Sequence, residues 1–421
     1  MENKSRHPWF FIPTLYFAEG LPYIIINSVS SVVYTKLGIP KDVMTFWTGF
    51  LYLPWILKMV WSPLLENRSK KFILSSAQFL LAIIFLLTGL AFNLNNFFVA
   101  SLLGFAAGAF ISATYDAATD GYYMLVLDKE RQSFYVGIRT FFYRLSMIFG
   151  SGIIVMLAGR LEVKTGNIAP AWTISFTAVA AVFFIFTIWH FFILPRDAKP
   201  PSSLRCDATA PKAAQNFKEV FKTYFTQKNI LIILIFILVY RLGEASLEKL
   251  IAPFMLDPKS AGGLAVSTET FGFIKGTVAM IALIAGNILG GIALAKYGFK
   301  KCLWPFVVLL NAPNIFYVIM AVFKPALWIV AVLVSFEQFG YGLGFMAFTV
   351  FVMKISQKSK YPTSYYAIST GIMALGMMIP NMMSGRLQVS VGYTNFFIIA
   401  CILSIPSFFI APYAIKIFED K

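Results

Sequence analysis

Apolar runs of twenty or more residues recur along the whole chain, and this repetition restricts the fold more than any other sequence feature. A helix needs about 20 apolar residues to cross a bilayer, because it rises only about 1.5 Å per residue. Only 13% of the residues are charged, whereas soluble domains carry about 25%. We therefore expect an all-α polytopic membrane protein.

The runs define twelve expected spans in two groups of six. The first six are expected at 9–34, 43–65, 72–92, 97–127, 133–159 and 170–194. The other six are expected at 229–256, 268–295, 301–322, 326–355, 361–387 and 391–417. This pattern predicts an N-terminal half at 1–194, a cytoplasmic linker at 195–228 and a C-terminal half at 229–421.

The basic residues of the connecting segments predict the orientation of the chain. With the N-terminus inside, 22 of the 35 Lys and Arg residues lie in cytoplasmic segments, and seven lie on the opposite side. Lys and Arg accumulate on the cytoplasmic side of membrane proteins. Both termini are therefore expected to be cytoplasmic.

The linker at 195–228 is the one long polar stretch. Its last part carries Phe217, Val220, Phe221 and Phe225 on one side and several lysines on the other. Such a segment favours an amphipathic helix on the inner membrane surface, where anionic lipids attract lysine. A plain connector is the alternative interpretation.

The two halves share weak internal symmetry. Glu19 lies near the middle of the first expected span, and Glu244 lies near the middle of the seventh. Basic turns follow both the second and the eighth span, at 61–71 and 295–301. Two six-helix halves around a long central loop indicate the major facilitator fold, with a substrate site between the halves near the membrane midplane.

Several charges lie inside the expected spans of the first half. Each costs roughly 2.5–3.5 kcal/mol at a helix centre, so such residues usually face partners or a water-filled path. Asp116 and Asp120 are one helical turn apart, and the next span carries Arg139 and Arg144. The helical rise places Arg139 at a depth similar to that of Asp120, so pairing of either aspartate with either arginine is open. Lys58 lies toward the inner end of the second span.

The second half carries its own set of charges. Arg241, Glu244 and Glu248 are spaced by three and four residues, so they share one helix face. Glu248 and Lys275 are both expected on the outer side of the midplane, where they could form a second pair. Glu337 lies near the middle of its span.

Three roles compete for these charges: structural pairs or gates, proton coupling and substrate binding. Glu19 and Glu337 have no basic neighbour on their own helix, which makes them the preferred proton carriers. Asp116 and Asp120 have arginines in reach and therefore suit switchable ion pairs. Aromatic residues such as Tyr115 could stack on a sugar, although packing or lipid contact is the favoured explanation for each of them.

Other functional classes receive no support from the sequence. The net charge of +16 comes from short loops between spans, so nucleic acid is not an expected partner. Three scattered cysteines and two histidines give no metal-ligand spacing, and no metal or other cofactor is expected. Nucleotide-binding and hydrolase motifs are absent from the sequence, so an enzyme is not expected either.

Several sequence blocks together resemble the AmpG-type muropeptide permeases and their acetyl-coenzyme A transporter relatives in the major facilitator superfamily. In the first half they read F-A-E-G-L-P, L-P-W-I-L-K-M-V-W-S-P-L-L-E, S-A-T-Y-D-A-A-T-D-G-Y and G-I-R-T-F-F-Y-R-L-S-M. In the second half they read V-Y-R-L-G-E-A, F-E-Q-F-G-Y-G-L-G and Y-P-T-S-Y-Y-A-I-S-T. They extend over about 17–370, which is most of the chain.

The resemblance implies proton-driven uptake of GlcNAc-anhydromuramyl peptides across the bacterial inner membrane. The residues that match the family's motif positions are Lys58, Asp116, Asp120, Arg139, Arg144, Arg241, Glu244, Lys275, Glu337 and Gln338. Three residues depart from the family pattern, which usually has Asp at Glu66, often Ser at Glu19 and Arg at Tyr123. Relatives with this framework also handle siderophore complexes and coenzyme A esters.

These observations lead to a proton-coupled importer of an anionic sugar-peptide, acting as a monomer in contact with membrane lipids. The expected substrate-binding residues are Arg144, Arg241, Lys275, Gln338, Tyr115 and Tyr240. The expected proton carriers are Glu19, Glu244 and Glu337. The expected ion-pair or gate residues are Asp116, Asp120, Arg139, Lys58 and Glu248. The alternatives are a siderophore, coenzyme A ester or drug carrier, a non-transporting membrane receptor, and a lipid-handling protein.

Overall fold

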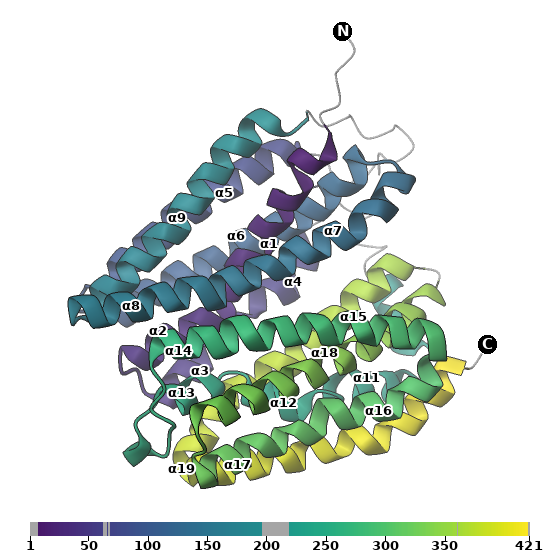
Figure 1. Ribbon diagram of the computed structural model, residues 1–421. Coiled ribbons are helices and arrows are strands. Elements are labelled where there is room, and N and C mark those ends of the chain that lie inside the picture. The colour runs from purple at the N-terminus through teal and green to yellow at the C-terminus, as the bar shows by residue number, and fades with distance from the viewer. Residues whose placement is uncertain (1–6, 62–64, 66–67, 196–218, 360, 420–421) are drawn as a thin grey trace. The chain divides into compact units, whose positions relative to one another are not determined.

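The structure is a computed structural model, and it describes residues 7–61, 65, 68–195, 219–359 and 361–419. The described residues are helical, with short turns between the helices and no strand (Figure 1). They form two compact units. The first unit comprises Met1–Ala198, Lys249–Ile281 and Met382–Ser390, and the second comprises Lys199–Glu248, Ala282–Asn381 and Val391–Lys421.

The first unit is built mainly from the N-terminal part of the chain. Its helices there are η1 (Pro8–Phe10), α1 (Ile12–Ile24), η2 (Ile25–Val29), α2 (Ser30–Lys36), α3 (Lys41–Phe50), α4 (Leu53–Trp61), α5 (Lys70–Ala91), α6 (Phe97–Val126), α7 (Lys129–Ile148), η4 (Phe149–Ile154), α8 (Val155–Thr165) and α9 (Ile168–Ile193). Four helical segments from later in the chain complete it: α13 (Ile251–Leu256), η6 (Lys259–Ala261), α14 (Thr268–Phe271) and η7 (Gly272–Val278). Helix α5 packs between α6 and α9, and α1 packs on α7 (Figure 1).

The second unit contains the remaining helices. They are α11 (Ile230–Val239), α12 (Leu242–Leu247), most of α15 (Ala279–Tyr297), α16 (Phe299–Asn311), η8 (Ala312–Asn314), α17 (Ile315–Phe323), α18 (Leu327–Gln357) and both ends of α19 (Pro362–Glu419). Helix α19 is broken at Gly392, whose φ of 77° is a left-handed conformation that glycine adopts easily.

Helices occupy every expected span, but they are not all continuous. Nine helices of the described part are long and apolar enough to cross a membrane, and a tenth arises if 219–226 and α11 count as one bent span. The nine count α19 once, although Gly392 divides it between the two last expected spans. The second expected span is divided into α3 and α4, and the seventh into α11, α12 and α13.

Two sequence predictions about element ends need correction. The fifth span was expected to end at Gly159, but α8 continues to Thr165 and ends at Gly166, which has a φ of 65°. A left-handed glycine is a common helix terminator, so the later glycine is the one that stops the helix. At its other end, this span was expected to begin at 133, but α7 begins at Lys129. Asp128 caps the helix there by accepting from the backbone N–H of Arg131 at 2.8 Å.

Residues 196–218 of the expected linker lie outside the described residues, as does Glu66. Residues 219–226 are helical, as the amphipathic pattern predicts. The buried positions there are Val220 and Tyr224, whereas Phe225 is exposed. Tyr224 shares a hydrogen bond of 2.8 Å with Ser369 of α19, so part of the expected lipid-facing side packs on protein.

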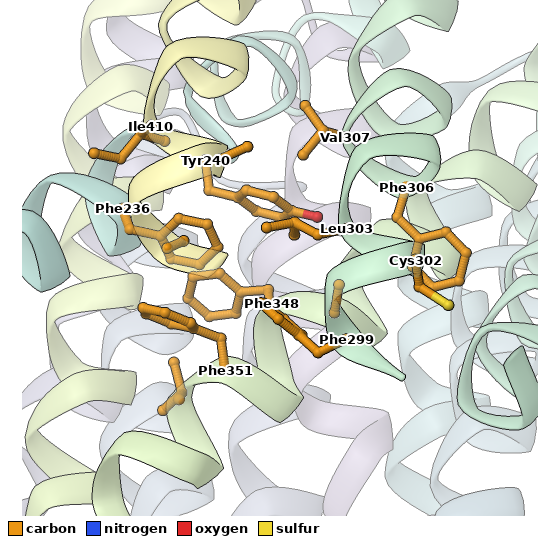
Figure 2. Close-up of a cluster of buried hydrophobic side chains, with 14 of the residues drawn as sticks. Phe236, Tyr240, Phe299, Cys302, Leu303, Phe306, Val307, Phe348, Phe351 and Ile410 are labelled. Atoms are coloured by element: carbon orange, nitrogen blue, oxygen red, sulfur yellow. The ribbon is translucent and has the colours of Figure 1, made fainter. Parts of the chain in front are cut away.

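Aromatic side chains form much of both cores. In the first unit, Phe176 of α9 packs edge-on against Phe85 of α5 and Phe105 of α6. In the second unit, Phe236 of α11 lies 4.2 Å from Phe351 and next to Tyr240 and Phe348 (Figure 2). These cores fix the helices that carry the buried charges.

Candidate functional site

Charged and polar side chains of the expected spans form two clusters, one in each unit. The first charge cluster consists of Glu19, Lys58, Asp116, Asp120 and Arg139, and it lies among α1, α4, α6 and α7 of the first unit. The second charge cluster consists of Arg241, Glu244, Glu248, Glu337 and Gln338, and it lies in the second unit.

In the first charge cluster, Asp116 forms an ion pair with Lys58 of α4. The Lys58 side chain is 36% exposed and that of Asp116 is 16% exposed, so solvent still reaches the lysine. Helix α4 packs against α6. The sequence left the pairing of Asp116 with either arginine open, and it placed Lys58 among the expected ion-pair residues without naming its partner.

Asp120 forms the expected pair with Arg139, whose Nη1 atom lies 3.1 Å from Oδ1 of the carboxylate. The Tyr16 hydroxyl lies between them: it donates to Asp120 at 3.2 Å and accepts from Arg139 at 3.0 Å. The guanidinium also lies over the rings of Tyr16 and Tyr123, at 5.3 and 4.8 Å from their centroids. Arg139 is thus held by one carboxylate and two aromatic rings, and the predicted equality of depth is confirmed.

Glu19 is buried on α1, with its carboxyl group within hydrogen-bonding reach of Asp116. Lys58 and Asp120 also face it. Its Oε2 atom is buried, and no described residue donates a hydrogen bond to it. Two carboxyl groups at this range repel each other when both are ionised. Glu19 has no charged neighbour on its own helix, so the sequence did not indicate its charged neighbours on α4 and α6.

Arg144 is half-buried on α7, three residues before Met147, whose sulfur lies 3.5 Å from its Nη1 atom. Tyr115 of α6 is fully buried. Its hydroxyl donates to the carbonyl of Leu15 at 3.2 Å and accepts from Gln78 at 2.8 Å. Substrate binding by Arg144 and Tyr115 stays a prediction, and the burial of Tyr115 gives it no support.

His190 extends this buried polar chain across the first unit. It is fully buried on α9, with one ring nitrogen 2.8 Å from the Thr14 hydroxyl and the other 2.7 Å from Gln78. Gln78 also donates to Tyr115, so these contacts join α9 to α1, α5 and α6. The sequence does not indicate them, because the residues involved lie far apart along the chain.

The centre of the second charge cluster is Arg241, which immediately precedes α12. Its Nη2 atom donates to Glu244 Oε2 at 3.0 Å and to the Tyr341 hydroxyl at 2.6 Å. The ring centroids of Tyr341 and Phe345 lie 4.9 and 5.2 Å from the guanidinium carbon. Arg241 is only 6% exposed, and its Nε atom is buried without a hydrogen-bond partner among the described residues.

The other acids of this cluster have neutral hydrogen-bond donors. Glu337 of α18 accepts from the Tyr317 hydroxyl at 3.1 Å and from the Gln338 amide at 2.9 and 3.0 Å. Glu248 accepts from the Asn381 amide at 2.9 Å. The sequence did not indicate Tyr317 and Asn381 as site residues, because an isolated polar residue in an apolar helix has no periodic signal. The pairing of Glu248 with Lys275 stays a prediction.

Tyr240 and Lys275 complete the predicted site residues. Tyr240 is fully buried, and its hydroxyl donates to the carbonyl of Gly344 at 3.1 Å. This bond fixes the residue before Arg241 to α18, which suits a positioning role better than substrate contact. Lys275 is half-buried in η7 of the first unit. Lys249, another lysine of the first unit, is 1% exposed and donates to the backbone carbonyl of Asn27.

The segment 249–281 is tied to the N-terminal helices of the first unit by polar contacts. Glu162 of α8 accepts from Thr268 at 2.7 Å, from Trp172 at 2.9 Å and from Lys36 at 3.3 Å. Its neighbour Arg160 pairs with Glu269 at 2.6 Å. Glu162 lies beyond the expected end of the fifth span at 159, in the part of α8 that the sequence did not predict.

The helix backbones also approach closely here. A Cβ atom on Gly276 would lie 2.0 Å from the carbonyl oxygen of Ser151, and one on Gly159 would lie 2.2 Å from the backbone nitrogen of Glu269. Only glycine allows these approaches. Among the described residues, no group of three or more His, Cys, Asp or Glu side chains could hold a metal ion.

The sequence and the fold can now be compared with those of known proteins. The sequence profile described as Major Facilitator Superfamily matches residues 14–380. The chain belongs to this superfamily. It is therefore a multi-pass membrane protein that transports a small-molecule solute, and it is a permease, not an enzyme.

Its relatives narrow the resemblance to one branch. A putative transporter named AmpG 4 from Rickettsia conorii is 25% identical over 421 residues, which cover 96% of this chain and 95% of that protein. The anhydromuropeptide permease of Escherichia coli K12 is 23% identical over 396 residues, which cover 93% of this chain and 76% of that protein. The predicted resemblance to AmpG-type permeases is thus confirmed.

Solved structures agree on the fold. A D-xylose–proton symporter covers 96% of this chain and of its own, with a TM-score of 0.70 and 11% identity. A bacterial homologue of the human lysosomal transporter Spinster covers 99% of this chain and 98% of its own, with a TM-score of 0.71 and 14% identity. At these identities the likeness concerns the fold alone.

Proposed function

We propose that this protein imports an anionic sugar-peptide, a GlcNAc-anhydromuramyl peptide, across the bacterial inner membrane together with protons. In this proposal the chain acts as a monomer with twelve spans, and both termini and the linker at 195–228 are cytoplasmic. The bias of Lys and Arg toward the cytoplasmic segments supports the orientation. The name of the Escherichia coli relative supports the choice of solute.

The observation that carries the proposal is the burial and the hydrogen bonding of Arg241. A buried guanidinium whose Nε–H has no acceptor among the described residues, with two aromatic rings beside it, is suited to an anion attached to a larger organic molecule. A peptide stem supplies carboxylates, and sugar rings pack on aromatic faces. Arg144, Lys275 and Gln338 are the further proposed contacts for the solute.

Proton coupling has a physical reason when the solute is an anion. Moving one negative charge into a cytoplasm that is 100 mV negative costs about 2.3 kcal/mol. One accompanying proton cancels this charge, so the membrane potential no longer opposes import. The proposed proton carriers are the buried acids Glu19, Glu244 and Glu337. The proposed gate residues are Asp116, Asp120, Arg139, Lys58 and Glu248.

Uptake into proteoliposomes tests the proposal. Labelled anhydromuropeptide is supplied outside, with the outer solution either one pH unit more acidic than the lumen or at the same pH. One proton per solute would support accumulation of up to about tenfold over the outside concentration, because 1.4 kcal/mol corresponds to a factor of ten. Equal uptake with and without the gradient would contradict the coupling.

Competition defines the solute in the same assay. Unlabelled anhydromuropeptide should suppress the uptake of label, whereas a siderophore complex, a coenzyme A ester and a neutral disaccharide should not. Suppression by the coenzyme A ester and not by the muropeptide would move the solute to another class. Vesicles without protein provide the background for every arm.

A further inference from the structure

Within the proposed function, the contacts of Arg241 suggest how solute and proton are linked. We propose that Glu244 and the carboxylate of the solute compete for the Arg241 guanidinium, so that a proton must neutralise Glu244 before the solute can take its place. Glu244 is thus assigned as the acid that couples the two movements, and Arg241 as the group for which they compete. The inference rests on the proposed function.

The contacts at Nη2 leave the guanidinium no edge for a second, two-point contact with a carboxylate. An anion bound through two parallel hydrogen bonds uses Nε–H together with the N–H of Nη2 on the same edge. Nη2 has two hydrogens, and its two acceptors are Glu244 and Tyr341. Nε–H is free among the described residues. A two-point contact with a solute carboxylate must therefore displace an existing acceptor from Nη2.

The aromatic rings restrict the approach further. Tyr341 and Phe345 both lie within cation–π distance of the guanidinium carbon, at 4.9 and 5.2 Å. An anion is repelled by the negative face of an aromatic ring, so it can reach Arg241 only at an edge. Glu244 occupies part of that edge of the guanidinium, so the solute has to replace Glu244 there.

Charge decides which acceptor leaves. The ionisable groups facing Glu244 are Arg241, Glu248, Glu337 of α18 and Tyr317 of α17, and Arg241 is the cation among them. The side chains of Arg241 and Glu244 are only 7% and 11% exposed, so water screens little. Two carboxylates on one buried guanidinium would leave an unbalanced charge. A proton on Glu244 removes this imbalance, and the balance is one proton taken up per carboxylate bound.

Local backbone structure makes the exchange feasible. The helix is interrupted at Arg241, which has a φ of −117° and stands between α11 and the six-residue helix α12. Tyr240 anchors the preceding turn to the carbonyl of Gly344 at 3.1 Å. The guanidinium is therefore held in place by α11 and α18, whereas Glu244 belongs to a short helix. Displacement of Glu244 leaves the anchored arginine where it is.

Proton counting on the purified full-length protein in nanodiscs tests the inference. Anhydromuropeptide is titrated into weakly buffered wild-type protein between pH 6 and pH 8, and a pH dye and calorimetry in two buffers report the protons taken up. We expect about one proton per solute, and an affinity that rises about tenfold per pH unit of acidification where Glu244 is ionised in the free protein.

The variant Glu244→Gln keeps the size of the side chain and an oxygen acceptor for Arg241. We expect it to bind the solute without proton uptake and with an affinity that no longer depends on pH. The matched control is Glu419→Gln, a change in an exposed pair with Lys300, which should retain both properties of the wild type.

Two results would overturn the exchange while leaving the proposed solute in place. One is wild-type binding without proton uptake, a measurement that needs no variant. The other is proton uptake that persists in Glu244→Gln but disappears in Glu337→Gln. Absence of binding by the wild-type protein would overturn both the proposed solute and the exchange.

Discussion

The two charge clusters use the same chemical groups in different proportions. In the first, Lys58 pairs with Asp116 and Arg139 pairs with Asp120, so each cation has a carboxylate. In the second, Arg241 pairs with Glu244 and keeps a free N–H. The first cluster thus joins three helices through closed pairs, whereas the second retains binding capacity at its cation.

One tyrosine in each cluster shows the same difference between the two clusters. Tyr16 and Tyr341 each accept a hydrogen bond from a guanidinium and lie beneath it, in the first and the second cluster respectively. Tyr16 also donates to the carboxylate of its pair, at 3.2 Å. We infer that the first cluster holds helices together and that the second exchanges partners during transport.

Loss of the guanidinium in the second cluster should have the largest effect. Arg241→Met should weaken anhydromuropeptide binding about 30-fold or more, since truncating a buried charge contact costs about 2–5 kcal/mol. Arg241→Met/Glu244→Gln removes the unpaired acid and serves as the folding control. The affinity of Arg241→Lys should lie between those of the wild type and Arg241→Met, because lysine lacks the planar fork of the guanidinium. Calorimetric binding that is unchanged in Arg241→Met would contradict the assignment.

Loss of the lysine in the first cluster should affect stability more than binding. Lys58→Met leaves Asp116 beside Glu19 without its cation, at a cost of about 1–3 kcal/mol after allowance for the exposure of Lys58. The double variant Lys58→Met/Asp116→Asn should recover most of that stability. Thermal unfolding followed by size-exclusion chromatography measures both. If the double variant is no more stable than the single one, the pair does not stabilise the first unit.

The two tyrosines provide a smaller and more direct comparison. Tyr16→Phe should lower the free energy of unfolding by about 1 kcal/mol, because the hydroxyl bridges both members of a pair. Tyr341→Phe should change solute affinity more than unfolding, since it frees a hydrogen on Nη2 of Arg241. Unfolding and binding are measured for both variants. The opposite pattern would exchange the roles of the clusters.

The smallest effect is expected from Glu19→Gln. The proposed exchange places the coupling proton on Glu244, so this variant should keep at least about half of the proton-driven accumulation. It also retains an oxygen and an amide donor that can face Asp116. Proteoliposome uptake under a pH gradient measures it beside Glu244→Gln. Loss of coupling in Glu19→Gln alone would move the proton to the first cluster.

The sequence was sufficient for features that depend on spacing along one helix or on depth. The helical rise was enough to match Arg139 with Asp120, and the three-residue spacing was enough to join Arg241 with Glu244. The same regularity predicted helices in all expected spans. Hydropathy could not show that Gly166, and not Gly159, ends α8, because the last turns of α8 carry the charged residues Arg160, Glu162 and Lys164.

Contacts between distant segments could not be derived in this way. Lys58 of α4 meets Asp116 of α6, and the interruption between α3 and α4 has no hydropathy signal. Tyr317 and Asn381 donate to acids on other helices, and the rotation of each helix sets those contacts. A single sequence gives the face of a helix but not which neighbour that face meets.

The placement of 249–281 in the first unit has a consequence for synthesis. Glu162 and the close approach at Gly159 have to wait until Thr268 and Glu269 have been translated. At about 5–20 residues per second, roughly 4–15 s separate the end of α9 from that point. During this interval Glu162 lacks one of its three partners and a bare glycine surface stays uncovered in the nascent protein. A ribosome that stalls between α9 and α14 would therefore leave a first unit ready for quality-control proteases, and separately expressed halves would each carry an incomplete fold.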